Sequence, residues 1–206
     1  AQTNGPTNCG PAMAFNAVGT IVKAFLDPKT PINNGSFNPI SVTAPEKSFI
    51  NARETAPCGG MAEVKFLIDS VVAAAMGQVV PEMSVGDLKG GANHIHIAGP
   101  REDGGTYIHY EWPAGGTGAS AGVDGSNAVR SYNEGDFNSI QSAETVESQY
   151  PLRVERCEVR NGGCGDGAFR GGFGLRRDIK VLDETAMLSV LSEKNVIPPY
   201  GVAGGS

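Results

Sequence analysis

Glycine is distributed unevenly along this chain, and that distribution constrains how the chain can fold. The 206 residues include 29 glycines, many of which gather near residues 114–125 and 162–174. They follow no Gly-X-Y period, which excludes a collagen-like helix. Because glycine lacks a Cβ atom, it permits tight turns and close approaches between backbones. We therefore expect sharply turned, closely packed segments in these two regions.

Two helices are predicted before the first glycine cluster. In residues 9–27, Pro11 suits a first helical turn, Asn8 is a possible cap, and Asp27-Pro28 ends the helix. Apolar side chains recur there at helical spacing and form one stripe: Phe15, Val18, Ile21, Val22, Phe25 and Leu26. The pattern is typical of an amphipathic helix.

The second helix is predicted over residues 60–77. It has little polar surface, so we expect it to be buried on most sides. Its buried side is expected to carry Met61, Val64, Leu67, Ile68, Val71, Val72 and Ala75. Between the helices, the five prolines of residues 28–59 favour extended, turn-rich chain, with Phe37, Ile40 and Val42 on short strands.

The rest of the chain predicts β-strands. Residues 92–98 and 106–112 alternate in the strand manner, and a turn containing Asp103-Gly104-Gly105 joins them into a hairpin. Three further strands are expected at 152–160, 175–182 and 185–192. Within the second of these, alternation gives an apolar and a charged face.

These elements predict an α+β fold in which two early helices pack on a largely antiparallel, Gly-rich β region of sandwich type. We find no internal repeat and no linker that divides the chain cleanly. We therefore expect residues 1–206 to form one region, helical over 1–80 and β-rich over 81–206.

Charge and hydropathy exclude two classes of partner. The net charge is -6 and no basic stripe is present, which disfavours nucleic-acid binding. No apolar run reaches about 18 residues, so we expect no transmembrane helix and no membrane partner. The chain also begins without Met and enters a predicted helix within about ten residues, which favours a processed or fragmentary chain.

The four cysteines form no CxxC pair, so we interpret them as reduced thiols; a disulfide or metal role is the alternative. Cys9 lies near a predicted helix N-terminus, where the helix dipole would stabilise a thiolate. It is therefore a candidate nucleophile, with a small buried residue as the other interpretation.

The three histidines are candidate metal ligands. His94 and His96 lie two apart in a predicted strand, so both rings project from one face, and His109 lies on the partner strand. Three converging neutral imidazoles could bind zinc or another divalent ion. Alternatively, they are polar strand residues that line a cleft or a wet sheet face.

Glu111 follows His109 on the same face of its strand. A carboxylate beside an imidazole can act in general acid/base catalysis or can orient the ring. Neighbours of this kind are also common on solvent-facing strands. Glu111 and His109 are our candidate catalytic residues.

The glycine clusters offer candidate anion-binding sites. Residues 115–125 could form a nest of backbone N–H groups, with Gly116, Gly118 and Asp124 as candidate binding residues. Arg170, in the second cluster, could pair with a carboxylate or phosphate, or could hold its loop through backbone carbonyls. No Walker-type motif and no Rossmann glycine pattern is placed before a helix, so we expect no independent ATP binding by this chain.

Short signatures occur in a fixed order along nearly the whole chain: residues 6–11, 27–37, 44–53, 110–125, 150–156, 171–174 and 191–201. In that order they resemble the hydantoinase B/oxoprolinase family, and in particular the C-terminal part of a B-type subunit. Two positions depart from the family pattern: Asn38-Pro39-Ile40 replaces an Arg-Pro, and Asn93-His94-Ile95-His96 stands where many relatives have Asn and Thr.

The resemblance implies one component of a cytoplasmic ATP-dependent enzyme. In such enzymes a hydantoinase A-like subunit handles ATP and Mg and phosphorylates a carbonyl oxygen, and the B-type subunit processes the intermediate. The implied reaction is the opening of a cyclic amide of the 5-oxoproline or hydantoin type. The relatives include 5-oxoprolinase, N-methylhydantoinase, caprolactamase, and the acetone and acetophenone carboxylases.

The resemblance also implies two partners, namely the hydantoinase A-like subunit and the N-terminal part of the B-type subunit, without which this chain is expected to be inactive. The metal site of the carboxylase relatives lies in that N-terminal part, so no metal ligand is carried over to this chain. Two other hypotheses remain open. One is a ketone carboxylase, in which a phosphoenol attacks carbon dioxide; the other is a non-catalytic structural subunit or fragment.

Overall fold

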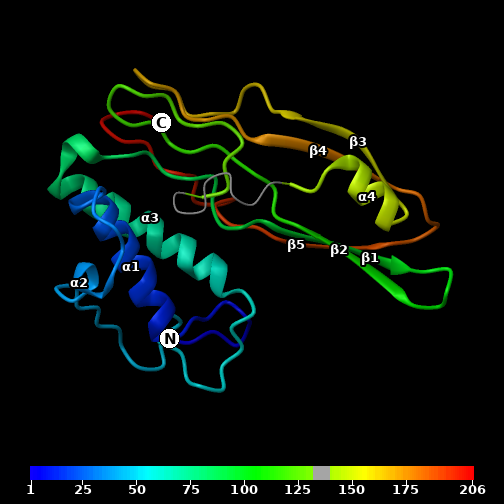
Figure 1. Cartoon of the computed structure of the whole chain (residues 1–206), viewed down its shortest axis with the longest axis horizontal. Coiled ribbons are helices and arrows are strands. Elements are labelled where there is room, and N and C mark those ends of the chain that lie inside the picture. The colour runs from blue at the N-terminus through cyan, green and yellow to red at the C-terminus, as the bar shows by residue number, and fades with distance from the viewer. Residues whose placement is uncertain (132–139) are drawn as a thin grey trace. The chain divides into compact units, whose positions relative to one another are not determined.

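A computed structural model of the chain describes residues 1–131 and 140–206 (Figure 1). The chain divides into two compact units, Ala1–Asp87 and Leu88–Ser206. In the described residues the first unit contains helices and the second contains every strand, together with one further helix. The predicted α+β class is therefore confirmed.

The first unit is built on α1 (Pro11–Leu26) and α3 (Met61–Val79), which pack against each other. Both predicted helices are confirmed to within about two residues at each end. A shorter α2 (Asn34–Phe37) and a 3₁₀ turn, η1 (Pro81–Met83), complete the unit. Cys9, Ala14 and Val64 form its small core, against which Met13, Ile50 and Ile68 pack.

The buried faces of these helices differ from the predicted ones. In α1 the buried residues are Ala14, Ala17, Gly19, Ile21 and Lys23, whereas Leu26 of the expected stripe is 62% exposed. Small residues let neighbouring chain approach closely: a Cβ atom on Gly19 would come within 2.9 Å of the Phe37 ring. Hydrophobic spacing alone therefore identified only part of the buried face: Ile21 is buried as expected, whereas Leu26 is not.

The α3 helix buries acidic side chains that an apolar pattern cannot indicate. Glu63 and Asp69 are almost fully buried, while Val71, expected inside, is 69% exposed. Lys65 Nζ donates to Asp69 Oδ2 at 2.7 Å, one turn away on the same helix. This charged hydrogen bond offsets part of the cost of burying the carboxylate.

Two local predictions in the first unit are wrong. Asn8 does not cap α1, because its side-chain amide donates to the carbonyl oxygens of Gly5 and Pro57. Phe37 lies in a helical turn rather than a strand, and Ile40 and Val42 lie outside any strand. The reason is that the Asn33 side chain accepts a hydrogen bond from the Ser36 amide and caps the single turn of α2.

The second unit contains two antiparallel sheets, shown in Figure 1. Strands β1 (His94–Pro100), β2 (Thr106–Glu111) and β5 (Met187–Leu191) form one sheet in the order β2-β1-β5. Strands β3 (Leu152–Val159) and β4 (Leu175–Val181) form the other, with a bulge between Val154 and Arg156. All five predicted strands are thus present, and the predicted hairpin is β1–β2.

One hydrophobic core joins the two sheets. Ile97 and Tyr107 from the first sheet and Leu152 from the second are buried together with Val146 of α4 (Ala143–Gln149). Val154, Ile179 and Val181 pack against this cluster. The sheets therefore share an interior, as the sandwich prediction requires.

Helix α4 was not expected from the sequence, because only Val146 in it is buried and apolar. Its start is fixed by Ser142, whose side chain accepts a hydrogen bond from the Thr145 amide.

None of the helices in the described residues combines the length and apolar character needed to cross a bilayer.

The shared core gives a stability prediction. Leu152 is 1% exposed, so Leu152→Ala should lower the free energy of unfolding by roughly 2–5 kcal/mol, because it removes apolar contacts and leaves a cavity. Leu182, which is 50% exposed near the end of β4, is the matched control, and Leu182→Ala should cost less than about 1 kcal/mol. Urea unfolding measures both; equal losses would contradict the shared core.

Candidate functional site

The inner face of β2 carries a row of polar side chains. Burial alternates strictly along this strand, so Tyr107, His109 and Glu111 point toward the core while Ile108 and Tyr110 point outward. His109 is fully buried and Glu111 is 7% exposed. Both candidate catalytic residues therefore lie side by side in the interior of the second unit.

Glu111 bridges His109 to an arginine of the other sheet. Its Oε2 atom lies 3.1 Å from His109 Nε2, and its Oε1 atom lies 3.3 Å from Arg177 Nε on β4. The Arg177 guanidinium also donates to the Gln141 carbonyl oxygen at 2.9 Å. The three side chains are 5% exposed or less. We call His109, Glu111 and Arg177 the buried triad.

The triad determines which nitrogen of His109 is available. With Nε2 donating to the Glu111 carboxylate, Nδ1 keeps its lone pair, and it has no hydrogen-bond partner among the described residues. A carboxylate that orients an imidazole in this way suits general acid/base chemistry, and it also suits a purely structural polar network. Because the ring is fully buried, a reactant reaches Nδ1 only if neighbouring chain moves.

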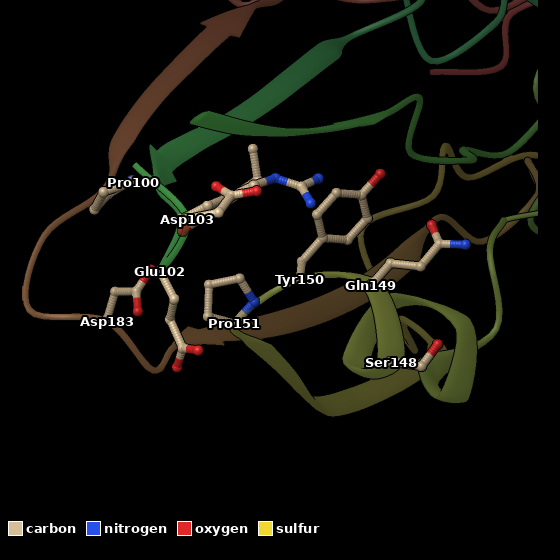
Figure 2. Close-up of a pocket in the computed structure, with 10 residues that line it drawn as sticks. Pro100, Glu102, Asp103, Ser148, Gln149, Tyr150, Pro151 and Asp183 are labelled. Atoms are coloured by element: carbon tan, nitrogen blue, oxygen red, sulfur yellow. The ribbon is translucent and has the colours of Figure 1, made fainter. Parts of the chain in front are cut away.

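One neighbour of His109 is Tyr150, whose ring meets the imidazole edge-on at 5.2 Å between centroids. Tyr150 also lines a pocket of about 510 Å³, surrounded by the β1–β2 turn, the end of α4 and Asp183 (Figure 2). The buried Tyr107 side chain lines the same pocket, and burial, followed by the nearby Asp183 carboxylate, raises the pKa of Tyr107. Tyr150 therefore both lines the pocket and contacts His109 of the triad.

His94 and His96 lie on the opposite face of the sheet. Their rings stack with Tyr110, at centroid distances of 5.7 and 4.5 Å, and Tyr110 accepts a hydrogen bond from Trp112 Nε1 and bonds to His94 Nδ1. Because His109 points into the core, the three histidines do not converge as expected. The described residues contain no group of three or more His, Cys, Asp or Glu side chains that could hold a metal ion.

The two glycine clusters cross each other through backbone contacts. Gly172 N–H donates to the Thr117 carbonyl oxygen at 2.8 Å, and Gly125 N–H donates to that of Arg170 at 2.8 Å. A Cβ atom on Gly116 or Gly172 would lie 1.9 Å from a carbonyl oxygen of the other segment. The expected close approaches therefore occur, and they occur between the two clusters.

Asp124 and Arg170, two of the candidate anion-binding residues, interact with each other. Arg170 Nε lies 3.4 Å from Asp124 Oδ2, and Arg170 N–H donates to Asp124 Oδ1 at 3.0 Å. The guanidinium also donates to the Gly171 carbonyl oxygen, as its alternative loop-holding role requires. Anion binding by Gly116, Gly118, Asp124 and Arg170 remains a prediction.

Cys9 is fully buried in the core of the first unit. Burial, followed by the neighbouring Cys58, raises the pKa of its thiol, which disfavours the thiolate that a nucleophile needs. The small-buried-residue interpretation therefore fits Cys9. All four cysteines are free in the structure.

Sequence reasoning missed Arg177 and Tyr150. Alternation along 175–182 puts Arg177 on the same side as Leu175 and Ile179, so a cation on the apolar face of a strand was the available signal. Tyr150 lies in the 150–156 signature, but nothing there marked it as a site residue, because its contacts with Tyr107 and His109 come from the packing of separate elements.

The buried triad predicts a large cost for breaking its ion pair. Glu111→Gln leaves the Arg177 cation buried without its carboxylate, so we expect a loss of about 3–5 kcal/mol of unfolding free energy. Glu158→Gln, which removes the exposed partner of Arg156, should cost less than about 1 kcal/mol. If chemical denaturation gives the two variants the same stability, the Glu111 carboxylate does not stabilise the buried Arg177 cation as expected.

His94, on the face of the sheet opposite His109, predicts that the stability of the fold depends on pH. Burial, and then the nearby charges of His96 and Lys89, lowers the pKa of His94 below its ordinary value of about 6.5. As pH falls below about 6.5, the unfolded chain takes up a proton that the folded chain resists, so stability present at higher pH is lost.

His94→Asn, which keeps a polar group near the Tyr110 hydroxyl, should therefore flatten the fall in melting temperature between about pH 7.5 and pH 5. His96→Asn should flatten it less, because burial of His94 remains the larger cause. Parallel melting curves for His94→Asn and the unmodified chain would exclude this role.

Comparison with known proteins gives relatives along nearly the whole chain. The 5-oxoprolinase of Dictyostelium discoideum is 30% identical over 99% of the chain, which covers 15% of that protein. The crystal structure of an ATP-dependent caprolactamase from Pseudomonas jessenii matches 87% of the chain, with a TM-score of 0.71 and 25% identity, over 32% of its own length. A nucleotide-free structure of acetone carboxylase matches 89%, with a TM-score of 0.70 and 19% identity, over 25% of its length.

The chain spans only 15% to 35% of the length of the curated relatives that it first matches. The family model for hydantoinase B/oxoprolinase matches residues 1–206. The ordered motifs, the α+β fold and these matches agree: this chain belongs to the hydantoinase B/oxoprolinase family.

Proposed function

We propose that this chain is a component of an ATP-dependent amidohydrolase that opens a cyclic amide of the 5-oxoproline or hydantoin type. The observation that carries the proposal is the match to a protein named 5-oxoprolinase over 99% of the chain. In this scheme a hydantoinase A-like partner binds ATP and Mg and phosphorylates the amide oxygen. The present chain then acts on the activated carbonyl together with the rest of a B-type subunit.

Three relatives with 25% to 30% sequence identity to this chain support the hydrolase over the carboxylase. The 5-oxoprolinase is 30% identical, a putative B-type subunit of a D-/L-hydantoinase is 28% identical, and the caprolactamase is 25% identical. All three names refer to cyclic amide substrates. The acetone carboxylase, at 19% identity, supports only the fold. We therefore keep the ketone carboxylase as an outcome that the assay must separate.

Within the proposed reaction, His109 is the candidate base. Glu111 holds its Nε2–H, so Nδ1 would take a proton from the attacking water and return it to the ring nitrogen of the cyclic amide as the C–N bond breaks. That break would leave an acyl phosphate, which a second water would hydrolyse to the carboxylate and inorganic phosphate. Glu111 and Arg177 are then positioning residues, because they hold the imidazole and balance charge without touching the substrate. Tyr150, between His109 and the pocket, would have to move to admit the reactants.

The test measures ATP turnover by the chain purified with its co-purifying partners. We expect ADP release with 5-oxoproline or hydantoin, formation of the ring-opened product, and no dependence on bicarbonate. Turnover of acetone or acetophenone that requires bicarbonate would replace the hydrolase with the carboxylase. If an assembled complex hydrolyses no ATP with any of these compounds, the result favours a non-catalytic structural role for this chain.

A variant separates catalysis from structure at His109. The substitution His109→Gln removes the basic Nδ1 atom, while the glutamine amide nitrogen still offers a donor to Glu111. We therefore expect kcat to fall by roughly 10²–10⁴-fold. His96→Gln, on the opposite face of the same sheet, should leave kcat unchanged. If His109→Gln lowers melting temperature but not kcat, the triad is structural.

A further inference from the structure

The pocket beside Tyr150 brings carboxylates and aromatic rings together (Figure 2). Its volume of about 510 Å³ lies in the range that small organic ligands occupy in proteins. Glu102 and Asp103 in the β1–β2 turn and Asp183 after β4 line it, and Arg101 is the only cation among the described residues that do so. The lining therefore carries excess negative charge, which favours a cationic ligand over an anionic one.

Two polar atoms of this lining lack hydrogen-bond partners. Tyr107 is 1% exposed, and neither its hydroxyl oxygen nor Asp183 Oδ2 has a partner among the described residues. Burial, and then the nearby Asp183 carboxylate, raises the pKa of Tyr107, so the two groups lie near each other without meeting in a hydrogen bond of normal geometry. Buried hydroxyls and carboxylates are normally paired, because leaving them unpaired is costly. A ligand that donates to both atoms would satisfy them.

The Tyr107 hydroxyl is given room by the strand next to it. Gly99 of β1 pairs with Tyr107 in the register, and a Cβ atom there would lie 2.7 Å from the hydroxyl oxygen. The rings of Tyr107 and Tyr150 both line the pocket, with centroids 6.0 Å apart and planes tilted by 50°. Tyrosine rings attract cations through their π electrons. The aromatic part of the lining therefore favours the same sign of ligand charge as the carboxylates do.

These groups suit an organic ammonium ion better than a metal ion. Among the residues that the structure describes, no three or more His, Cys, Asp or Glu side chains are arranged to hold a metal. A primary ammonium group has three N–H donors on one nitrogen, so it can donate to Asp183 Oδ2 and to the Tyr107 hydroxyl oxygen at once. Pro100, Pro151 and the tyrosine rings offer apolar surface for the rest of such a ligand.

We propose that this pocket binds a free small molecule that carries a primary ammonium group, with the nitrogen between Asp183 Oδ2 and the Tyr107 hydroxyl. Glu102 and Asp103, which are exposed, draw the cation toward the pocket by their charge. The occupant is a free compound because the pocket has room for much more than the side chain of one lysine. This inference concerns binding by the chain and does not rest on the proposed function.

Isothermal titration calorimetry tests the proposal on the chain purified with its co-purifying partners. The probe is 2-phenylethylammonium, and its matched controls are neutral 2-phenylethanol and anionic 3-phenylpropionate. We expect saturable binding of the ammonium probe alone, weaker at high ionic strength because salt screens the carboxylates. Nα-acetyl-lysine methylamide, which presents the same ammonium group on a peptide backbone, should bind less tightly than the probe.

Substitutions assign the binding to the two unpaired atoms. Asp183→Asn keeps the size of the side chain but removes its charge, so affinity for the ammonium probe should fall at least about 10-fold. Tyr107→Phe removes only the hydroxyl and should weaken binding roughly 3-fold or more. Glu184→Gln neutralises the adjacent exposed carboxylate, which is outside the pocket lining, and should leave affinity unchanged. Circular dichroism should show the same fold for all three variants.

A photoreactive amine locates the site without any substitution. A benzylamine that carries a diazirine should label peptides containing residues 100–103, 148–151 or 183, and excess 2-phenylethylammonium should suppress the labelling. Labelling confined to other peptides overturns the proposal, even if a variant fails to fold.

The other outcomes are equally decisive. Equal affinity for the amine and the alcohol, unchanged affinity in folded Asp183→Asn, or no binding of the amine each overturns the proposal. Tighter binding of Nα-acetyl-lysine methylamide than of the probe overturns it in favour of a lysine from another polypeptide. None of these measurements requires ATP turnover, so failure of this site and failure of the proposed function are distinguishable.

Discussion

The buried ion pair between Glu111 on β2 and Arg177 on β4 joins the two sheets of the second unit. Around it, the hydrophobic core between the sheets contains Ile97 and Tyr107 on one side and Leu152 and Ile179 on the other. An apolar interface tolerates small sliding movements, whereas a buried ion pair with a 3.3 Å separation specifies one relative position. The geometry at His109 depends on that position, because the same carboxylate holds the imidazole.

Strict alternation along β2 connects this interior to the opposite face of the sheet. One residue step separates His109, fully buried against Tyr150, from Tyr110, which stacks outside with His94 and His96. A shift of the β2 register by one residue would exchange the two sets and turn His109 and Glu111 to the opposite face of the sheet, away from Arg177. The backbone pairing of β1 with β2 is thus as important to the candidate site as the side chains themselves.

Much of the fold follows from local patterns, and the parts that do not have identifiable causes. The alternation of apolar and polar residues predicted the strands, and Pro11 and Asp27-Pro28 indicated where α1 begins and ends. The buried faces of α1 and α3 were found only in part in this way, because contact there also depends on Ala14, Gly19 and the paired carboxylate of Asp69. The pairing of His109 with Glu111 followed from strand periodicity, whereas Arg177 and Tyr150 reach the site only through the packing of separate elements.

The crossing of the two glycine clusters separates a closely packed stem from a more exposed tip. The stem is held by backbone hydrogen bonds between Thr117 and Gly172 and between Gly125 and Arg170, and a Cβ atom on Gly125 or Gly172 would have no room. The residues at the tip, 119–123, are half-buried or exposed and form only a local turn between Ser120 and Val123. Substitutions at the tip should therefore leave the backbone scaffold of the stem intact, whereas side-chain atoms added in the stem would force its two segments apart.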